Sequence, residues 1–83
     1  MSKAAKQVYQ LSEHQLGKLV GQGTHPGAQN AWDRVRKIRE AGGSPVTFYS
    51  EFDGFTVEDD HDQSADVIRR ILSMAQRSKA FPG

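Results

Sequence analysis

The sequence predicts a small single domain of the α+β class. Two stretches near the N-terminus and one near the C-terminus repeat apolar residues at helical spacing, and the stretch between them alternates with a period of two. A chain of 83 residues is long enough for one domain and not for two. We therefore expect one domain over residues 1–83, with two N-terminal helices, a β-hairpin, a C-terminal helix and flexible tails at 1–6 and 79–83. Residues 8–11 would form either a short third strand or an extended lead-in.

The first helix is expected to begin after Ser12. Ser12 and Gln15 have the spacing of a capping box, in which each side chain bonds to the backbone amide of the other residue. The segment Gly21-Gln22-Gly23 predicts the end of this helix after about two and a half turns. Its apolar stripe consists of Leu16, Leu19 and Val20.

The second helix is expected over residues 26–41 and carries four of the eleven basic residues. Thr24 can serve as its N-cap, and Pro26 is tolerated in a first helical turn. Two glycines, Gly42 and Gly43, predict its end. Its apolar face consists of Ala28, Ala31, Trp32, Val35 and Ile38.

A β-hairpin is expected to follow, with strands at 46–52 and 55–58. The Asp53-Gly54 pair is typical of a two-residue type I′ turn, which would place Phe52 opposite Phe55. The buried face of this register consists of Val46, Phe48, Phe52, Phe55 and Val57. Its outward face consists of Thr47, Tyr49, Thr56 and Glu58.

The last helix is expected to begin after Asp62, since acidic residues favour a helix N-terminus. Its apolar face is broad and consists of Val67, Ile68, Ile71, Leu72, Met74 and Ala75. We expect the centre of the core to consist of Trp32, Ile38, Phe48, Phe55, Ile68, Ile71 and Leu72.

Charge is segregated along the chain although the net charge is only +1. Residues 1–41 carry seven Lys or Arg against three Asp or Glu, a net charge of +4. Residues 42–62 carry six acidic residues and no Lys or Arg, and residues 63–83 carry four basic residues against one acidic residue. Segregation of this kind influences the choice of partner and the association rate rather than the fold.

Several functional classes lack their required residues. The chain has no cysteine, no apolar run of membrane-spanning length and no signal-peptide segment, so we expect a cytoplasmic protein without a membrane partner. The glycine-rich loop 21–27 lacks the spacing of a nucleotide-binding loop, and residues 59–62 lack the alternation of a calcium loop. The three histidines, His14, His25 and His61, lie in different elements. We expect no cofactor, no metal and no catalytic residues, and no motif is specific enough to indicate a family.

Binding of another protein is the function that this pattern favours, as a small inhibitor or regulator. An acidic rim around the hairpin would dock onto a basic surface, including one that normally binds nucleic acid, with Tyr49 as an aromatic anchor. The expected contact residues are Tyr49, Glu51, Asp53, Glu58, Asp59, Asp60 and Asp62. A free hairpin edge would also permit a homodimer.

The alternative is a small DNA- or RNA-binding regulator that uses the basic helix 26–41. Nucleic-acid affinity comes mainly from contacts between basic side chains and phosphates. The residues that would make these contacts are Arg34, Arg36, Lys37, Arg70 and Arg77.

Overall fold

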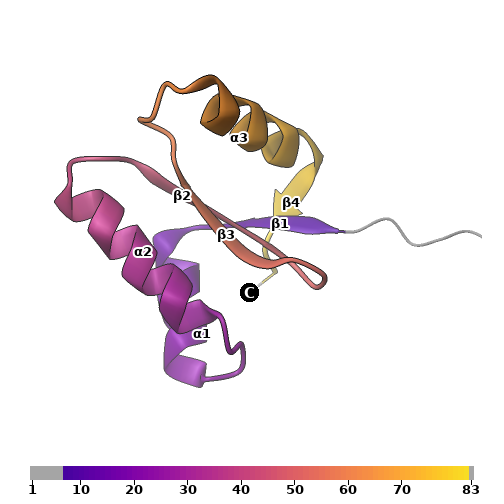
Figure 1. Cartoon of the computed structure of the whole chain (residues 1–83). Coiled ribbons are helices and arrows are strands. Elements are labelled where there is room, and N and C mark those ends of the chain that lie inside the picture. The colour runs from indigo at the N-terminus through magenta and orange to yellow at the C-terminus, as the bar shows by residue number, and fades with distance from the viewer. Residues whose placement is uncertain (1–6, 83) are drawn as a thin grey trace, which may run out of the picture.

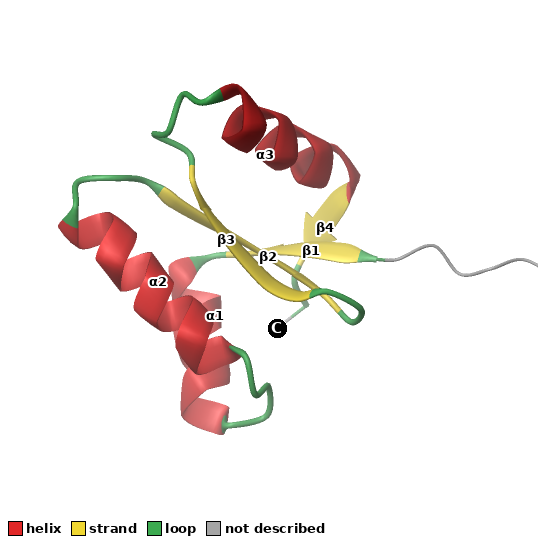
Figure 2. Ribbon diagram, in the orientation of Figure 1, coloured by secondary structure: helices red, strands yellow, loops and turns green. Residues whose placement is uncertain are grey.

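The computed structural model describes residues 7–82, which form a three-layer arrangement of helices and strands (Figures 1 and 2). In chain order the elements are β1 (Val8–Leu11), α1 (Glu13–Gln22), α2 (Ala28–Glu40), β2 (Pro45–Ser50), β3 (Gly54–Asp59), α3 (Ala65–Arg77) and β4 (Ser78–Ala80). Figures 1 and 2 show α1 and α2 together on one side of the sheet and α3 on the other. The expected α+β class is confirmed, with a four-stranded mixed sheet in place of a hairpin with at most a third strand. The expected tail at 1–6 lies outside the described residues.

The N-terminal helix forms as its capping signals predict. The Gln15 amide donates to Ser12 Oγ at 3.1 Å, and the Ser12 amide donates to Gln15 Oε1 at 2.9 Å. The helix ends at Gly23, which has a φ of 67° in the left-handed region that favours glycine. Leu16 and Leu19 are buried against the sheet. The capping-box prediction is therefore confirmed.

The second helix begins two residues later than expected. Its N-cap is Gly27, with no side-chain cap, so the prediction of Thr24 as N-cap is wrong. A Cβ atom at Gly27 would lie 3.3 Å from the ring of Phe55, which shows how closely this helix start approaches the sheet. Arg39, on the last turn of α2, pairs with Glu13 on the first turn of α1. The two helices are thus joined by an ion pair as well as by apolar packing.

The sheet has the strand order β3-β2-β1-β4, with β1 inside it. β1 runs antiparallel to β2 and parallel to β4. The strand alternative for residues 8–11 is therefore confirmed, whereas the expected tail at 79–83 is wrong over its described part. Residues 79 and 80 belong to β4, and the Phe81 amide donates to the Gln10 carbonyl at 3.2 Å.

The hairpin register differs from the expected one. Tyr49, not Phe52, lies opposite Phe55, and Glu51, Phe52 and Asp53 form a three-residue loop between β2 and β3. A type I′ turn needs a positive φ at Asp53, but within residues 7–82 only glycines have one, Gly54 among them at 73°. The Asp53 amide instead donates to Ser50 Oγ at 2.9 Å.

The observed pairing of β2 with β3 is shifted from the expected pairing by an odd number of residues. The side chains of β2 therefore lie on the opposite face from the one expected relative to β3. Tyr49 and Thr47 now share a face with Phe55 and Val57, towards α1 and α2, whereas Phe48 lies on the α3 side. The expected inward and outward sets are wrong in this respect. Thr47 and Glu58 are buried although expected outside, and Phe52 is 69% exposed although expected inside.

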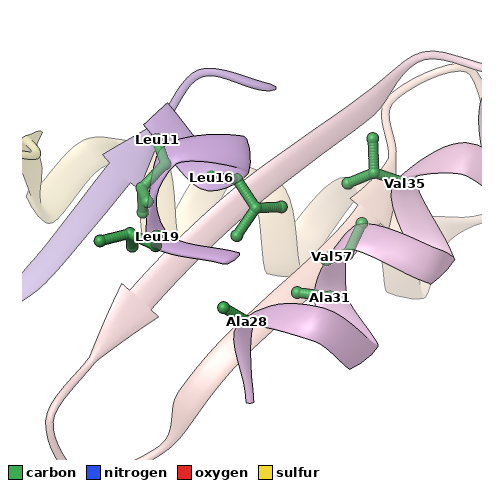
Figure 3. Packing of buried hydrophobic residues seen from close by; sticks show 7 residues of the cluster. All are labelled: Leu11, Leu16, Leu19, Ala28, Ala31, Val35 and Val57. Atoms are coloured by element: carbon green, nitrogen blue, oxygen red, sulfur yellow. The ribbon is translucent and has the colours of Figure 1, made fainter. Parts of the chain in front are cut away.

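The larger apolar core lies between the sheet and the helix pair α1–α2 (Figure 3). Figure 3 shows its buried side chains converging from four elements: Leu11, Leu16, Leu19, Ala28, Ala31, Val35 and Val57. Of the expected central residues, Phe48 is fully buried, and Trp32, Ile38, Phe55 and Ile71 are partly buried. Ile68 and Leu72 are exposed on α3, so their assignment to the core is wrong. None of the helices in the described part of the chain is long and apolar enough to cross a membrane.

Candidate interaction surface

The expected acidic rim is divided between the two ends of strand β3. Glu51 and Asp53 lie in the loop before the strand, whereas Asp60 and Asp62 follow it. A strand rises about 3.3 Å per residue, so the six-residue strand β3, which is roughly 17 Å long from its first to its last residue, separates these two groups. The rim is therefore two separate exposed pairs rather than one continuous surface.

Glu58, also expected in the rim, is buried and paired. Its side chain is 11% exposed and accepts from Arg70 Nε at 2.8 Å through Oε2 and from Arg70 Nη2 at 3.3 Å through Oε1. The hydrogen bond from Arg70 to the Glu58 carboxylate, together with their charge attraction, raises the pKa of Arg70. This contact anchors α3 to β3. The Glu58 carboxylate is therefore turned away from a partner, whereas the Arg70 side chain remains 52% exposed.

Asp59 holds two loops together. Its Oδ1 accepts from the Ser44 amide at 2.8 Å and from the His61 amide at 2.9 Å. These backbone hydrogen bonds lower the pKa of the Asp59 carboxyl. The same carboxylate lies so close to Gly43 that a Cβ atom there would be 2.6 Å from Oδ2. Asp59 therefore has a structural role, because its carboxylate joins the loop before β2 to the loop after β3.

Tyr49 lies inside an aromatic cluster and not on an outer face. Its ring centroid is 4.7 Å from that of Phe55, 5.3 Å from that of His25 and 6.3 Å from that of Phe81. The tyrosine is half-buried against the larger core. Its expected exposure as an aromatic anchor is wrong, because the hairpin register turns it towards α1 and α2.

The basic residues expected for nucleic-acid binding are also divided. Arg34 Nε on α2 donates to the Val57 carbonyl at 2.9 Å, and Arg70 is paired with Glu58. Exposed cations remain on both helices, Arg36 and Lys37 on α2 and Arg77 on α3. Because α2 and α3 lie on opposite sides of the sheet, these residues do not form one basic face (Figure 1).

An exposed apolar ridge on α3 is the surface that the sequence analysis missed. We call Ala65, Ile68, Leu72 and Ala75 the α3 ridge. All four are exposed, Ile68 by 39% and Leu72 by 54%, although α3 is strongly amphipathic. The opposite part of the apolar face points to the sheet, where Val67 is buried. The breadth of the apolar face was the available signal, since one contact with a sheet covers only part of such a face.

An open groove of about 450 Å³ adjoins the ridge at Ala75. It lies between the C-terminal end of α3 and strands β1 and β4. Its lining consists of Gln10, Leu11, Ser12, Ala75, Ser78 and Ala80. Ridge and groove together form a surface with both a projection and a recess.

Neither metal ligands among the described residues nor similarity to known proteins indicates a function for this surface. Within residues 7–82, no three His, Cys, Asp or Glu side chains come together in a way that could hold a metal ion. Comparison of the chain with protein-family models, curated proteins and solved structures finds no match.

Proposed function

We propose that this chain is a non-catalytic protein-binding module that docks on its partner through the α3 ridge. The observation that carries the proposal is the exposure of Leu72 and Ile68 on a helix already fixed to the sheet by the Arg70–Glu58 pair. Large apolar side chains that are held in place and left exposed are typical of interaction surfaces. Burial of the remaining exposed surface of Leu72 would contribute on the order of 1 kcal/mol to binding.

Charged residues surround this apolar centre, as is common at protein interfaces. Asp60 and Asp62 lie before the N-terminal end of α3, and Arg77 lies in its last turn. The exposed residues of the acidic rim that precede α3 thus form one polar border of the ridge. Such a border contributes more to association rate and specificity than to affinity.

Affinity capture with matched variants tests the proposal. The tagged chain, its Leu72→Gln variant and its Ser73→Gln variant are incubated with a nuclease-treated lysate of the source cells. Ser73→Gln is the control because it places the same side chain on the same helix outside the ridge, at another exposed position. We expect a stoichiometric protein that survives nuclease and is lost only with Leu72→Gln. Equal capture by all three chains would contradict the role of the ridge.

Nucleic-acid binding through α2 is the second candidate, and the exposure of Arg36 and Lys37 supports it. Asp33 and Glu40 lie beside these two residues on the same helix surface, which weakens the local positive potential. A nucleic-acid complex would lose affinity steeply with salt and on Arg36→Ala or Lys37→Ala. A protein complex formed through the α3 ridge would be indifferent to both substitutions.

A further inference from the structure

We propose that the partner of the α3 ridge is a second copy of this chain, with the two α3 helices packed antiparallel about a twofold axis. The inference rests on the proposed function, because it names the partner of the same ridge. Its support comes from the spacing of the ridge residues, the shape of the adjoining surface and the distribution of charge along α3.

The ridge residues are spaced as in paired helices. Ala65, Ile68, Leu72 and Ala75 follow one another at intervals of three, four and three residues, which is the spacing of the apolar seam between two packed helices. In an antiparallel pair centred between Ile68 and Leu72, Ile68 of each copy faces Leu72 of the other. The two alanines lie at the ends of the seam and let the helices approach closely there.

An open groove lies beside the ridge, where a twofold contact could use it. In such a contact the same patch of both copies must be complementary to itself. The groove of about 450 Å³ next to Ala75 recedes where the ridge projects. In the antiparallel arrangement Ala75 faces Ala65 of the other copy, so the first turn of one α3 helix covers the groove beside the last turn of the other.

Charge along α3 selects the antiparallel orientation. Asp62 precedes the helix and is exposed. An antiparallel pair separates the two Asp62 carboxylates and opposes the two helix dipoles, whereas a parallel pair brings these like charges together. Arg69 borders the middle of the seam, and Asp66 of the same helix lies 3.5 Å from it and offsets its charge.

The sheet edges are less suited to self-association than the ridge. At β3 the Arg34 side chain covers the Val57 carbonyl, and a charged side chain over an edge strand discourages pairing with another chain. At the other edge β4 has only three residues. The homodimer through the hairpin edge that the sequence suggests is therefore replaced by one through α3.

The size of the ridge indicates a weak dimer. Stable interfaces bury about 800 Å² per partner, roughly a seventh of the 5601 Å² surface of this chain. A helix of 13 residues is only about 20 Å long, so the area that a contact along α3 buries lies at the lower end of the areas found in stable interfaces. We expect the dimer to populate at concentrations of tens of micromolar and to dissociate on dilution.

Sedimentation velocity on the full chain from about 1 to about 300 µM gives the first test. We expect the wild type and Ser73→Gln to shift from monomer to dimer over this range, and Leu72→Gln to remain monomeric with an unchanged circular dichroism spectrum. A wild-type chain that stays monomeric at the highest concentration overturns the proposal, as does a dimer that Leu72→Gln leaves intact.

Disulfide trapping tests the orientation, because the chain contains no cysteine. A disulfide requires Cα atoms within about 7 Å, so it forms only between residues that face each other. We expect a mixture of Ile68→Cys and Leu72→Cys chains to form a mixed disulfide dimer under mild oxidation more readily than either variant alone. Faster cross-linking of each variant with itself would indicate parallel helices and would contradict the antiparallel pairing.

The two proposals fail in different ways. A chain that is monomeric at every concentration, yet captures a different protein through Leu72, overturns the homodimer and leaves the protein-binding function in place. A chain that neither dimerises nor captures a protein in a Leu72-dependent way overturns both.

Discussion

Arg34 of α2 covers the outer edge of the sheet by donating from Nε to the main-chain carbonyl of Val57 at 2.9 Å. This contact satisfies a carbonyl of the edge strand β3 and places a positive charge where another chain would otherwise add a strand. A residue expected to bind phosphates thus has a role within the fold.

Replacement of Arg34 by methionine should therefore expose the edge of β3. We expect Arg34→Met to lower the free energy of unfolding by about 1 kcal/mol, the usual net contribution of a hydrogen bond, and to increase aggregation on heating. Urea denaturation and light scattering would measure the two effects. Arg36→Met on the same helix is the matched control, and an equal loss of stability in both variants would show that the Val57 contact contributes nothing.

The pair formed by Glu58 and Arg70 leads to a second prediction. Arg70→Gln leaves the nearly buried Glu58 carboxylate without its cation, and we expect the melting temperature to fall by several degrees. The double variant Glu58→Gln, Arg70→Gln removes the unpaired charge and should be more stable than Arg70→Gln alone. Calorimetry on the four chains of this double-mutant cycle checks the coupling, and additive effects would mean that the two residues do not interact.

Local signals in the sequence predict the helices well. The Ser12–Gln15 capping box acts within four residues, and it depends little on the rest of the fold. The hairpin register is different, because Gly54 with its positive φ fits both the expected two-residue turn and the observed three-residue loop. Packing of Tyr49 and Phe55 against α1 and α2 accompanies the observed register, and this long-range contact is not visible in the local sequence.

The site was harder to predict than the fold for the same reason. Glu58 has the sequence context of an exposed strand residue, and its burial depends on Arg70, which lies twelve residues away on another element. The Ser78–Ala80 strand has no apolar alternation, and it forms only because β1 offers a parallel partner. Leu72 looked like a core residue, but a single helix on one face of the sheet leaves it half exposed.

Asp59 should make the stability of the chain depend on pH in the acid range. An unfolded aspartate has a pKa of about 3.9, and hydrogen bonds from the Ser44 and His61 amides lower the pKa of Asp59 in the folded state. Its contribution to stability is therefore present above the unfolded pKa and is lost as the pH falls through the lowered folded pKa. We expect Asp59→Asn to be less stable than wild type at pH 7 and to lose less stability between pH 7 and about pH 3.

Urea denaturation at a series of pH values measures this difference. Asp60→Asn is the control, because it removes a negative charge at the position next to Asp59. Among the described residues, no group donates a hydrogen bond to the Asp60 carboxylate, in contrast to that of Asp59. Parallel stability curves for wild type and Asp59→Asn would show that the two amide contacts do not stabilise the ionised carboxylate.

Phe81 gives the last prediction, which concerns the strand that the sequence did not predict. Its ring meets Tyr9 edge-on at 5.8 Å, and its carbonyl accepts from Gln15 Nε2 at 2.9 Å, so the residue after β4 ties the chain's C-terminal segment to β1 and α1. Because the ring is only half-buried, Phe81→Ala should lower the free energy of unfolding by roughly 1–2 kcal/mol, less than the loss for a fully buried phenylalanine. Pro82→Ala, at the next and exposed position, should change the free energy of unfolding little.

Hydrogen exchange gives an independent readout of the Phe81 contact. The Phe81 amide, which donates to the Gln10 carbonyl, should be protected in wild type and lose that protection in a chain whose β4 detaches. Rapid exchange of this amide in the wild type would mean that the segment is not held to the sheet.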